Sequence, residues 1–265
     1  MARLSDLALK YRLLIQGYPF RRVNWRPGDR LEKPLSQARV ALITTAGFYL
    51  PDQQPFQQSF RHDDCSFRVI PWGTPTEMLL IGQSSDAFDH TGIEADRNLA
   101  LPLDRLRELV DDGIVGEGAP RHFSFMGSII APARLISESG PEIARLLGDD
   151  KVDAVFLAPV CPFCHQAAGL LQSLIEKAGI PTVSISLLVD VTARVEPPRV
   201  LVVNRPLGYP WASPTILRCR SRSWARRLIF YPAVSRVHRW PIHSSSISTN
   251  QLRSSSQEAS RHARQ

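Results

Sequence analysis

The order of apolar and polar positions along the chain predicts strands that alternate with amphipathic helices. Continuous apolar runs, typical of strands buried on both faces, cover residues 38–47, 65–71, 121–127, 152–160, 181–189 and 199–204. Apolar side chains recur at helical spacing over residues 1–16, 102–113, 141–148 and 164–179. This pattern predicts a three-layer α/β fold, with a mostly parallel sheet and helices on both faces. A binding crevice is expected beyond the carboxyl ends of the strands.

The same pattern divides the chain into three parts. We expect an N-terminal helix and extended arm over residues 1–37, an α/β domain over 38–210, and an irregular C-terminal tail over 211–265. Charged residues interrupt the N-terminal helix and follow it, so it does not resemble an export signal. The sequence contains no run of about 18 apolar residues, which a membrane span needs. A cytoplasmic chain is therefore expected.

The net charge of +7 comes from the tail alone. Residues 211–265 contain ten Arg, no Lys and one acid, Glu258, whereas residues 1–210 hold 22 basic and 24 acidic residues. A net charge near −2 over the first 210 residues gives no reason to expect a polyanionic partner. We therefore predict that the α/β domain binds neither nucleic acid nor membrane.

The tail itself has two interpretations. A Ser/Arg-rich arm could bind RNA or a membrane surface, with Trp224 and Trp240 as stacking or headgroup residues. The favoured interpretation is a frameshift. If WASPTILRCRSRSW is back-translated and read with one base added in front, the permitted codons include LGEPNDPEMQIQIL, a turn followed by a helix start.

The candidate chemistry lies in CPFCH, residues 161–165. Its spacing suits a dithiol redox pair, half of a zinc site, or attachment of a c-type haem through the following His165. Haem attachment requires export, and zinc requires four ligands although no second ligand pair stands out. Two buried, inert cysteines are a further alternative. Acidic clusters at 63–65 and at 86–90 suggest a metal by composition only, so redox or nucleophilic use without a metal is favoured.

The position of the motif supports reactive thiols. Cys161 follows a predicted strand, and Cys164 is expected to open the next helix. Backbone N–H groups and the positive end of a helix stabilise a thiolate and lower the pKa of a thiol. We therefore predict Cys161 as the attacking thiol and Cys164, one turn later, as the thiol that resolves an adduct. Pro162 stiffens the turn between them.

Five further residues are candidates for substrate binding. Thr44, Thr45 and Gly47 follow the first predicted strand, where their backbone N–H groups are expected to face a carboxylate. His122, at the start of another strand, is a candidate acid or base. His165 lies in the first turn of the helix and is expected to tune Cys164. Structural roles remain open for all five.

Seven segments resemble the selenoprotein B family of glycine, sarcosine, betaine and D-proline reductases, over about residues 38–210. They read VALITTAGFYL, SFRVIPWGTPTEMLL, DHTGIEADRN, PLDRLRELVDDGIV, APRHFSFMG, VDAVFLAPVCPFCHQ and IEKAGIPTVSIS. In that family a selenocysteine ends the strand, two residues follow, and then comes a cysteine. The resemblance places Cys161 at the selenocysteine and Cys164 at the cysteine. It also implies a Gly-Glu-Pro turn and a helix after LGYP, as the shifted frame yields.

The resemblance implies a reductive cleavage of a carbon–nitrogen bond in an amino acid or related amine. A partner subunit would carry a pyruvoyl group that captures the amine, the chalcogen would attack the α-carbon, and a dithiol or thioredoxin-like reductant would return the electrons. No cofactor is expected on this chain itself. The alternative is an inactive, frameshifted relative that serves as a binding or scaffold module.

Overall fold

A seven-stranded sheet forms the centre of the chain in the computed structural model, which describes residues 2–22, 31–57, 63–83 and 85–211. The strand order is β3-β6-β1-β7-β8-β9, and β5 pairs with the start of β1. All neighbours are parallel except β3, an edge strand antiparallel to β6. The strands are β1 (Arg39–Thr44), β3 (Phe67–Pro71), β5 (Glu117–Gly118), β6 (Arg121–Phe125), β7 (Ala154–Ala158), β8 (Thr182–Ser186) and β9 (Val200–Val202).

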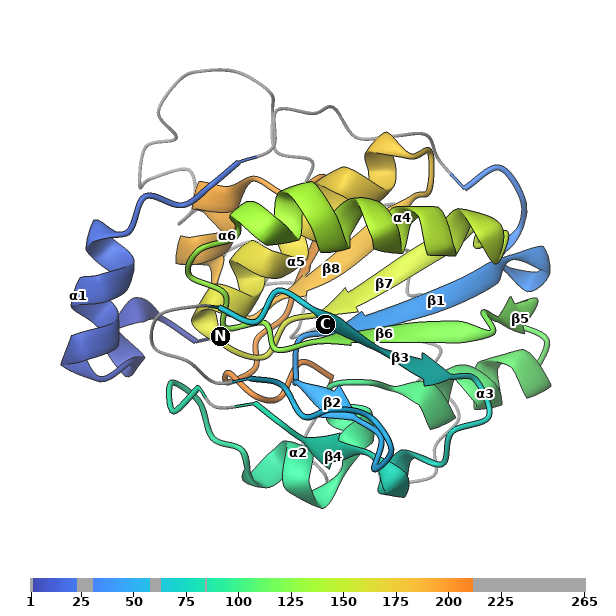
Figure 1. Cartoon of the computed structure of the whole chain (residues 1–265), viewed down its shortest axis with the longest axis horizontal. Helices are drawn as coiled ribbons and strands as arrows, with labels where there is room; N and C mark the ends of the chain where they lie inside the picture. The colour runs from blue at the N-terminus through green and yellow to red at the C-terminus, as the bar shows by residue number, and fades with distance from the viewer. Residues whose placement is uncertain (1, 23–30, 58–62, 84, 212–265) are drawn as a thin grey trace, which may run out of the picture.

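Helices cover both faces of this sheet (Figure 1). Alternate residues of β1 enter two different apolar clusters: Leu42 packs in a cluster with residues of α3, and Ile43 in one with residues of α4 and α5. Successive side chains of a strand point to opposite faces, so two clusters require two covering layers. The α-helices are α1 (Leu9–Gly17), α2 (Thr91–Ala95), α3 (Leu103–Asp111), α4 (Gly140–Asp149), α5 (Pro162–Lys177) and α6 (Val189–Val195).

Short elements connect these layers. A small antiparallel sheet pairs β2 (Phe48–Tyr49) with β4 (Leu80–Ile81). Single 3₁₀ turns and one π-helical turn, over Leu135–Ser139, lie in the connections. The 3₁₀ turns cover Leu4–Asp6, Leu35–Gln37, Thr76–Met78 and Arg97–Leu99. The predicted three-layer α/β fold with a mostly parallel sheet is confirmed.

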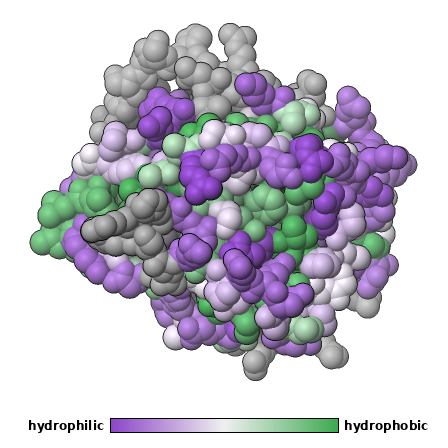
Figure 2. Space-filling view, viewed as in Figure 1, coloured by the Kyte–Doolittle hydropathy of each residue, from purple (hydrophilic) through white to green (hydrophobic). Residues whose placement is uncertain are grey.

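The first predicted helix and the strand predicted over 181–189 differ from the structure. The first helix begins at Leu9 and not at residue 1, and its Leu9 and Leu13 side chains are each 59% exposed. Figure 2 shows apolar side chains gathered on the surface at the end of the molecule where Figure 1 places α1. The strand predicted over 181–189 ends at Ser186, and the apolar residues that follow begin helix α6. A short apolar run is compatible with either state, and packing against α5 decides it here.

The end of the described chain extends the fold by one residue beyond the predicted boundary. Trp211 is buried and packs on Phe156 of β7 with ring centroids 4.4 Å apart. The predicted tail from residue 212 onward lies outside the described residues. None of the helices in the described part of the chain is long and apolar enough to cross a membrane.

Candidate functional site

The candidate site lies where the carboxyl ends of parallel strands meet. Strand β1 ends at Thr44, β6 at Phe125 and β7 at Ala158. Thr44 pairs with Ser124 on one side and with Ala158 on the other, so these three strand ends are aligned. The turn from β7 to α5 carries the two cysteines to this edge, where α/β proteins bind their ligands.

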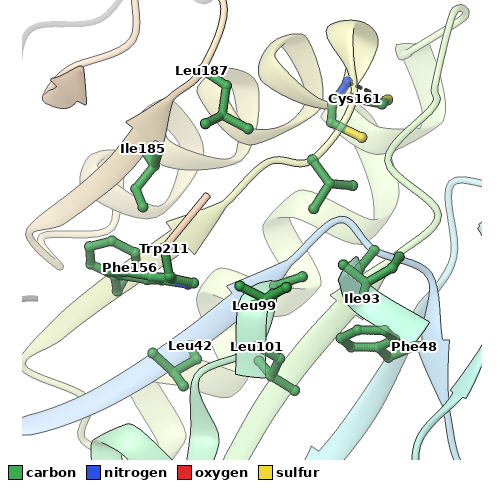
Figure 3. Close-up of a cluster of buried hydrophobic side chains, with 14 of the residues drawn as sticks. Leu42, Phe48, Ile93, Leu99, Leu101, Phe156, Cys161, Ile185, Leu187 and Trp211 are labelled. Carbon is green, nitrogen blue, oxygen red and sulfur yellow. Dashed lines mark hydrogen bonds between the residues drawn. The ribbon is translucent and has the colours of Figure 1, made fainter. Parts of the chain in front are cut away.

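Cys161 is the N-cap of α5. Its Sγ accepts a hydrogen bond from the backbone N–H of Cys164 at 3.2 Å, and Pro162 occupies the first turn. A proline is favourable there because its missing N–H would have no helical partner. The helix therefore begins at Pro162, two residues before the predicted start, and Cys164 lies in its first turn. Figure 3 shows Cys161 at the start of α5, beside the buried apolar side chains.

Backbone groups surround the sulfur of Cys164. Its Sγ lies 3.6 Å from the carbonyl oxygen of Thr45 and 3.9 Å from Nε2 of Gln83. A Cβ at Gly127 would lie only 2.8 Å from this sulfur. Gly127 has a φ of +76°, which also favours glycine. The sulfur of Cys164 thus lies between the ends of β1 and β6, and position 127 has no room for a side chain larger than that of glycine.

Both thiols are fully buried, and Cys161 Sγ accepts the backbone N–H of Cys164. Burial raises the pKa of the Cys161 thiol well above its usual value. Burial also acts to raise the pKa of Cys164, but hydrogen bonds from Cys161, Thr45 and the backbone at Val160 outweigh it, so this pKa is lowered. The sequence predicted the lower pKa at Cys161. In the folded chain, hydrogen bonds act to lower the pKa of Cys164 as well, the second sulfur of the motif.

The segment 205–211 covers the turn that carries Cys161. The N–H of Gly208 donates to the carbonyl of Val160 at 2.9 Å, and the Tyr209 hydroxyl donates to Asp89 Oδ2 at 2.9 Å. Gly208 has a φ of +88°, and a Cβ there would lie 2.6 Å from the Asp89 carbonyl oxygen. The hydroxyl of Ser85 also contacts Cys161. Because both thiols are fully buried, a ligand can reach them only if the surrounding structure opens.

The turn after β1 uses its backbone donors internally. The N–H of Thr45 donates to the Ala158 carbonyl, that of Ala46 to the Thr44 hydroxyl, and that of Gly47 to the Phe125 carbonyl at 2.8 Å. The N–H groups of Thr45 and Gly47 that were expected to face a carboxylate are therefore occupied. Thr45 contributes instead through its carbonyl and hydroxyl, both of which contact Cys164.

His165 joins the helix start to the end of β8. Its Nε2 accepts the N–H of Leu187 at 3.0 Å and of Leu188 at 3.3 Å, so Nδ1 carries the proton and donates to the Cys161 carbonyl at 2.8 Å. Burial lowers the pKa of His165 to about 4. A neutral ring with both nitrogens engaged positions the cysteine turn, and its ring hydrogen bonds go to backbone groups and not to the thiols.

His122 lies within the sheet and away from this edge. It is level with Leu42, whose N–H it accepts at Nδ1 over 2.9 Å, and it packs against the Trp72 ring. Burial, followed by the charge of Arg107, lowers the pKa of His122 to about 3. The structure therefore does not bring this predicted acid or base together with Cys161 and Cys164.

The acidic clusters serve local contacts. Asp86 pairs with Lys10, Asp89 accepts from Thr91 and Tyr209, and Asp64 accepts backbone N–H groups of its own loop. Within the described ranges, no group of three or more His, Cys, Asp or Glu side chains could hold a metal ion.

Sequence reasoning missed Gln83, Ser85 and Gly127. These residues lie in loops, and none belongs to a motif with a chemical signature. The structure shows Gln83 and Gly127 beside Cys164, and Ser85 beside Cys161. A glycine at the end of the strand predicted over 121–127 was the one available signal.

Comparison with known proteins identifies related chains. The family model for glycine/sarcosine/betaine reductase selenoprotein B matches residues 18–160, and its match ends one residue before Cys161. D-proline reductase subunit gamma of Acetoanaerobium sticklandii is 34% identical over 69% of this chain and 73% of its own length. No solved structure matches the chain.

Two further relatives are longer. Glycine reductase complex component B subunit gamma of Symbiobacterium thermophilum is 26% identical over 80% of this chain and 49% of its own length. Sarcosine reductase complex component B subunit beta of Peptoclostridium acidaminophilum is 26% identical over 73% of this chain and 45% of its own length. The chain thus spans about half the length of these two relatives. The family match and the D-proline reductase relative together show that this chain belongs to the glycine/sarcosine/betaine reductase selenoprotein B family.

Proposed function

We propose that this chain is the thiol-bearing subunit of a reductase complex that cleaves a carbon–nitrogen bond in an amino acid or related amine. The observation that carries the proposal is the pair of neighbouring cysteines at the carboxyl edge of the sheet, where Cys161 Sγ accepts the backbone N–H of Cys164. Family membership supports it, because the relatives are named as subunits of D-proline, glycine and sarcosine reductases.

The substrate amine is activated by a pyruvoyl group on a second subunit. Cys161 Sγ attacks the α-carbon and forms a carbon–sulfur bond, while the nitrogen leaves with the bonding electron pair and takes a proton from solvent. Cys164, whose pKa is the lower of the two, takes the proton of Cys161 in this step.

Disulfide formation completes the reduction. Cys164 Sγ attacks Cys161 Sγ, the carbon–sulfur bond breaks, and the released carbon takes the proton that Cys164 held. The substrate gains two electrons and the dithiol becomes a disulfide. An external dithiol or thioredoxin-like protein then reduces that disulfide.

The test uses the complex purified through this chain, supplied with dithiothreitol and assayed with D-proline, glycine, sarcosine and betaine. Cys161→Ser is expected to lower turnover at least about a thousandfold, because the nucleophile is lost. Cys164→Ser is expected to stop after one addition and to accumulate a Cys161 adduct, visible by mass spectrometry.

Cys65→Ser is the matched control. Cys65 is also buried, but it packs in the other apolar cluster, so this variant is expected to keep full turnover. Unchanged turnover in Cys161→Ser would refute the proposal.

Complete burial of both thiols is also compatible with an inert pair of cysteines. The reactive and the inert interpretations differ in whether a reagent can reach Cys161 when the surrounding segment opens. Opening of segment 205–211 should expose Cys161, and Tyr209→Phe removes the hydrogen bond to Asp89. Such an exposed bond contributes about 1 kcal/mol, so alkylation of Cys161 by iodoacetamide is expected to become about fivefold faster. Peptide mass spectrometry measures the rate.

Tyr49→Phe, which removes a hydroxyl from β2, is the control for Tyr209→Phe and should leave the rate unchanged. Cysteines that resist alkylation equally in the wild type and in Tyr209→Phe would favour the inert, scaffold interpretation.

A further inference from the structure

Gln83 is a buried amide at the edge of the sheet that carries the two thiols. It follows β4 directly after Gly82, and only 6% of its surface is exposed. A buried amide must satisfy its donors and its acceptor within the protein. The partners of Gln83 therefore show what its side chain does.

The amide is held in one orientation. Its Nε2 donates to the carbonyl oxygens of Thr45 at 2.8 Å and Met126 at 2.5 Å, and its Oε1 accepts the N–H of Ser85 at 3.0 Å. Two carbonyls on one side and an N–H on the other exclude the flipped amide. The nitrogen end thus faces the turns after β1 and β6.

The same nitrogen end faces the sulfur of Cys164. Nε2 lies 3.9 Å from this sulfur, and the Thr45 carbonyl oxygen that it pairs lies 3.6 Å from it. A carbonyl oxygen stabilises a thiol, whose proton it can accept, and repels a thiolate. Gln83 occupies one lone pair of that oxygen and so weakens its longer hydrogen bond from the Cys164 thiol. The amide also directs its own positive end toward the sulfur, and both effects favour the thiolate.

Two glycines leave the room that this arrangement needs. A Cβ at Gly47 would lie 2.8 Å from the backbone nitrogen of Gln83, and a Cβ at Gly127 would lie 2.8 Å from Cys164 Sγ. The side chains of Gln83 and Cys164 can therefore approach each other because residues 47 and 127 have no Cβ.

We propose that Gln83 is a positioning residue that favours the ionised form of Cys164 by pairing the carbonyl oxygens of Thr45 and Met126. The use of this thiolate in reduction rests on the proposed function, whereas its reactivity is a property of the chain itself. The second contact of the amide, with Ser85, places that residue beside Cys161.

The pH dependence of alkylation tests the proposal. The full chain is treated with iodoacetamide between pH 5 and 10, and fragment ions separate modification at Cys164 from that at Cys161. Gln83→Glu keeps the shape and the acceptor for Ser85 but replaces the donor with a carboxylate oxygen. This variant is expected to move the midpoint of Cys164 alkylation upward by about one pH unit or more, and to slow alkylation at pH 7 about tenfold.

Gln83→Leu separates positioning from a merely structural role. Loss of the donor should again move the midpoint upward and slow alkylation at pH 7. A residue that only stabilised the fold would, when replaced, open the site and accelerate alkylation at every pH without moving the midpoint. That outcome would overturn the inference.

Gln53→Leu is the matched control. Gln53 also bridges backbone groups through its amide, donating to the Val69 carbonyl and accepting the N–H of Leu50, but it contacts no thiol. The pH midpoint of Cys164 alkylation in Gln53→Leu should equal that in the wild type. If the midpoint moves in the Gln83 variants but the complex reduces no amine, the proposed function fails and this inference stands. If the complex is active and the midpoint does not move, the inference alone fails.

Discussion

The free energy of unfolding of this chain is expected to fall by about 3 kcal/mol between pH 6.5 and pH 5. His122 and His165 are buried and neutral, with pKa values of about 3 and about 4 in place of 6.5. Between the folded and the unfolded pKa the unfolded chain binds more protons, so stability is lost as the pH falls. Each histidine then costs at most about 1.4 kcal/mol per pH unit. Because its unfolded form is already half protonated at pH 6.5, the loss from there to pH 5 is about 1.6 kcal/mol per histidine.

The hydrogen bonds explain why neither histidine takes a proton in the folded chain. Nδ1 of His122 and Nε2 of His165 both accept backbone N–H groups, and protonation would break these bonds and leave a charge in the core. The carboxyls with lowered pKa, such as Asp104, weaken the fold only near and below their usual range around pH 4. The window from pH 6.5 to 5 therefore isolates the histidines.

Urea denaturation at several pH values measures this effect. His122→Asn offers an oxygen in place of Nδ1, and His165→Gln offers one in place of Nε2, so each variant should remove about half of the pH dependence. The double variant should be nearly flat from pH 6.5 to 5. A wild-type stability that does not change over this window would contradict the burial of two neutral rings.

Gly127→Ala is expected to lower the free energy of unfolding by about 3–5 kcal/mol. The methyl group would lie 2.6 Å from the Thr45 carbonyl oxygen and 2.8 Å from Cys164 Sγ, and alanine strongly disfavours a φ of +76°. The two strand ends that flank the sulfur would have to separate, because backbone cannot move aside as a flexible side chain can. Urea denaturation at pH 7.5 measures the loss.

Gly113→Ala separates the backbone strain from the steric clash. Gly113 has a φ of +68°, but a Cβ there meets nothing within 4 Å, so only the strain of about 1 kcal/mol is expected. Equal losses in the two variants would show that the space beside Cys164 is not tightly packed.

The thiol pair shows how far local reasoning reaches. Strand, turn and helix were predictable around Cys161, because a buried apolar run and a following amphipathic helix are encoded in adjacent residues. The start of α5 was misplaced by two residues, since only the folded turn shows that Cys161 accepts the capping N–H. The contribution of Thr45 to the lowered pKa of Cys164 was not predictable, because Thr45 lies far from the motif in the sequence.

The amino-acid pattern was enough to predict the alternation of strands and helices, the parallel sheet, the turn that carries Cys161 and Cys164, and the family resemblance. The packing of distant segments was needed to show that Gln83 faces the sulfur of Cys164 and that segment 205–211 covers the turn. These contacts join residues 81 and 120 positions apart, in the pairs Gln83–Cys164 and Asp89–Tyr209. Periodicity reports only on neighbours within a strand or helix, whereas burial and hydrogen bonding at the sheet edge depend on how distant segments pack together.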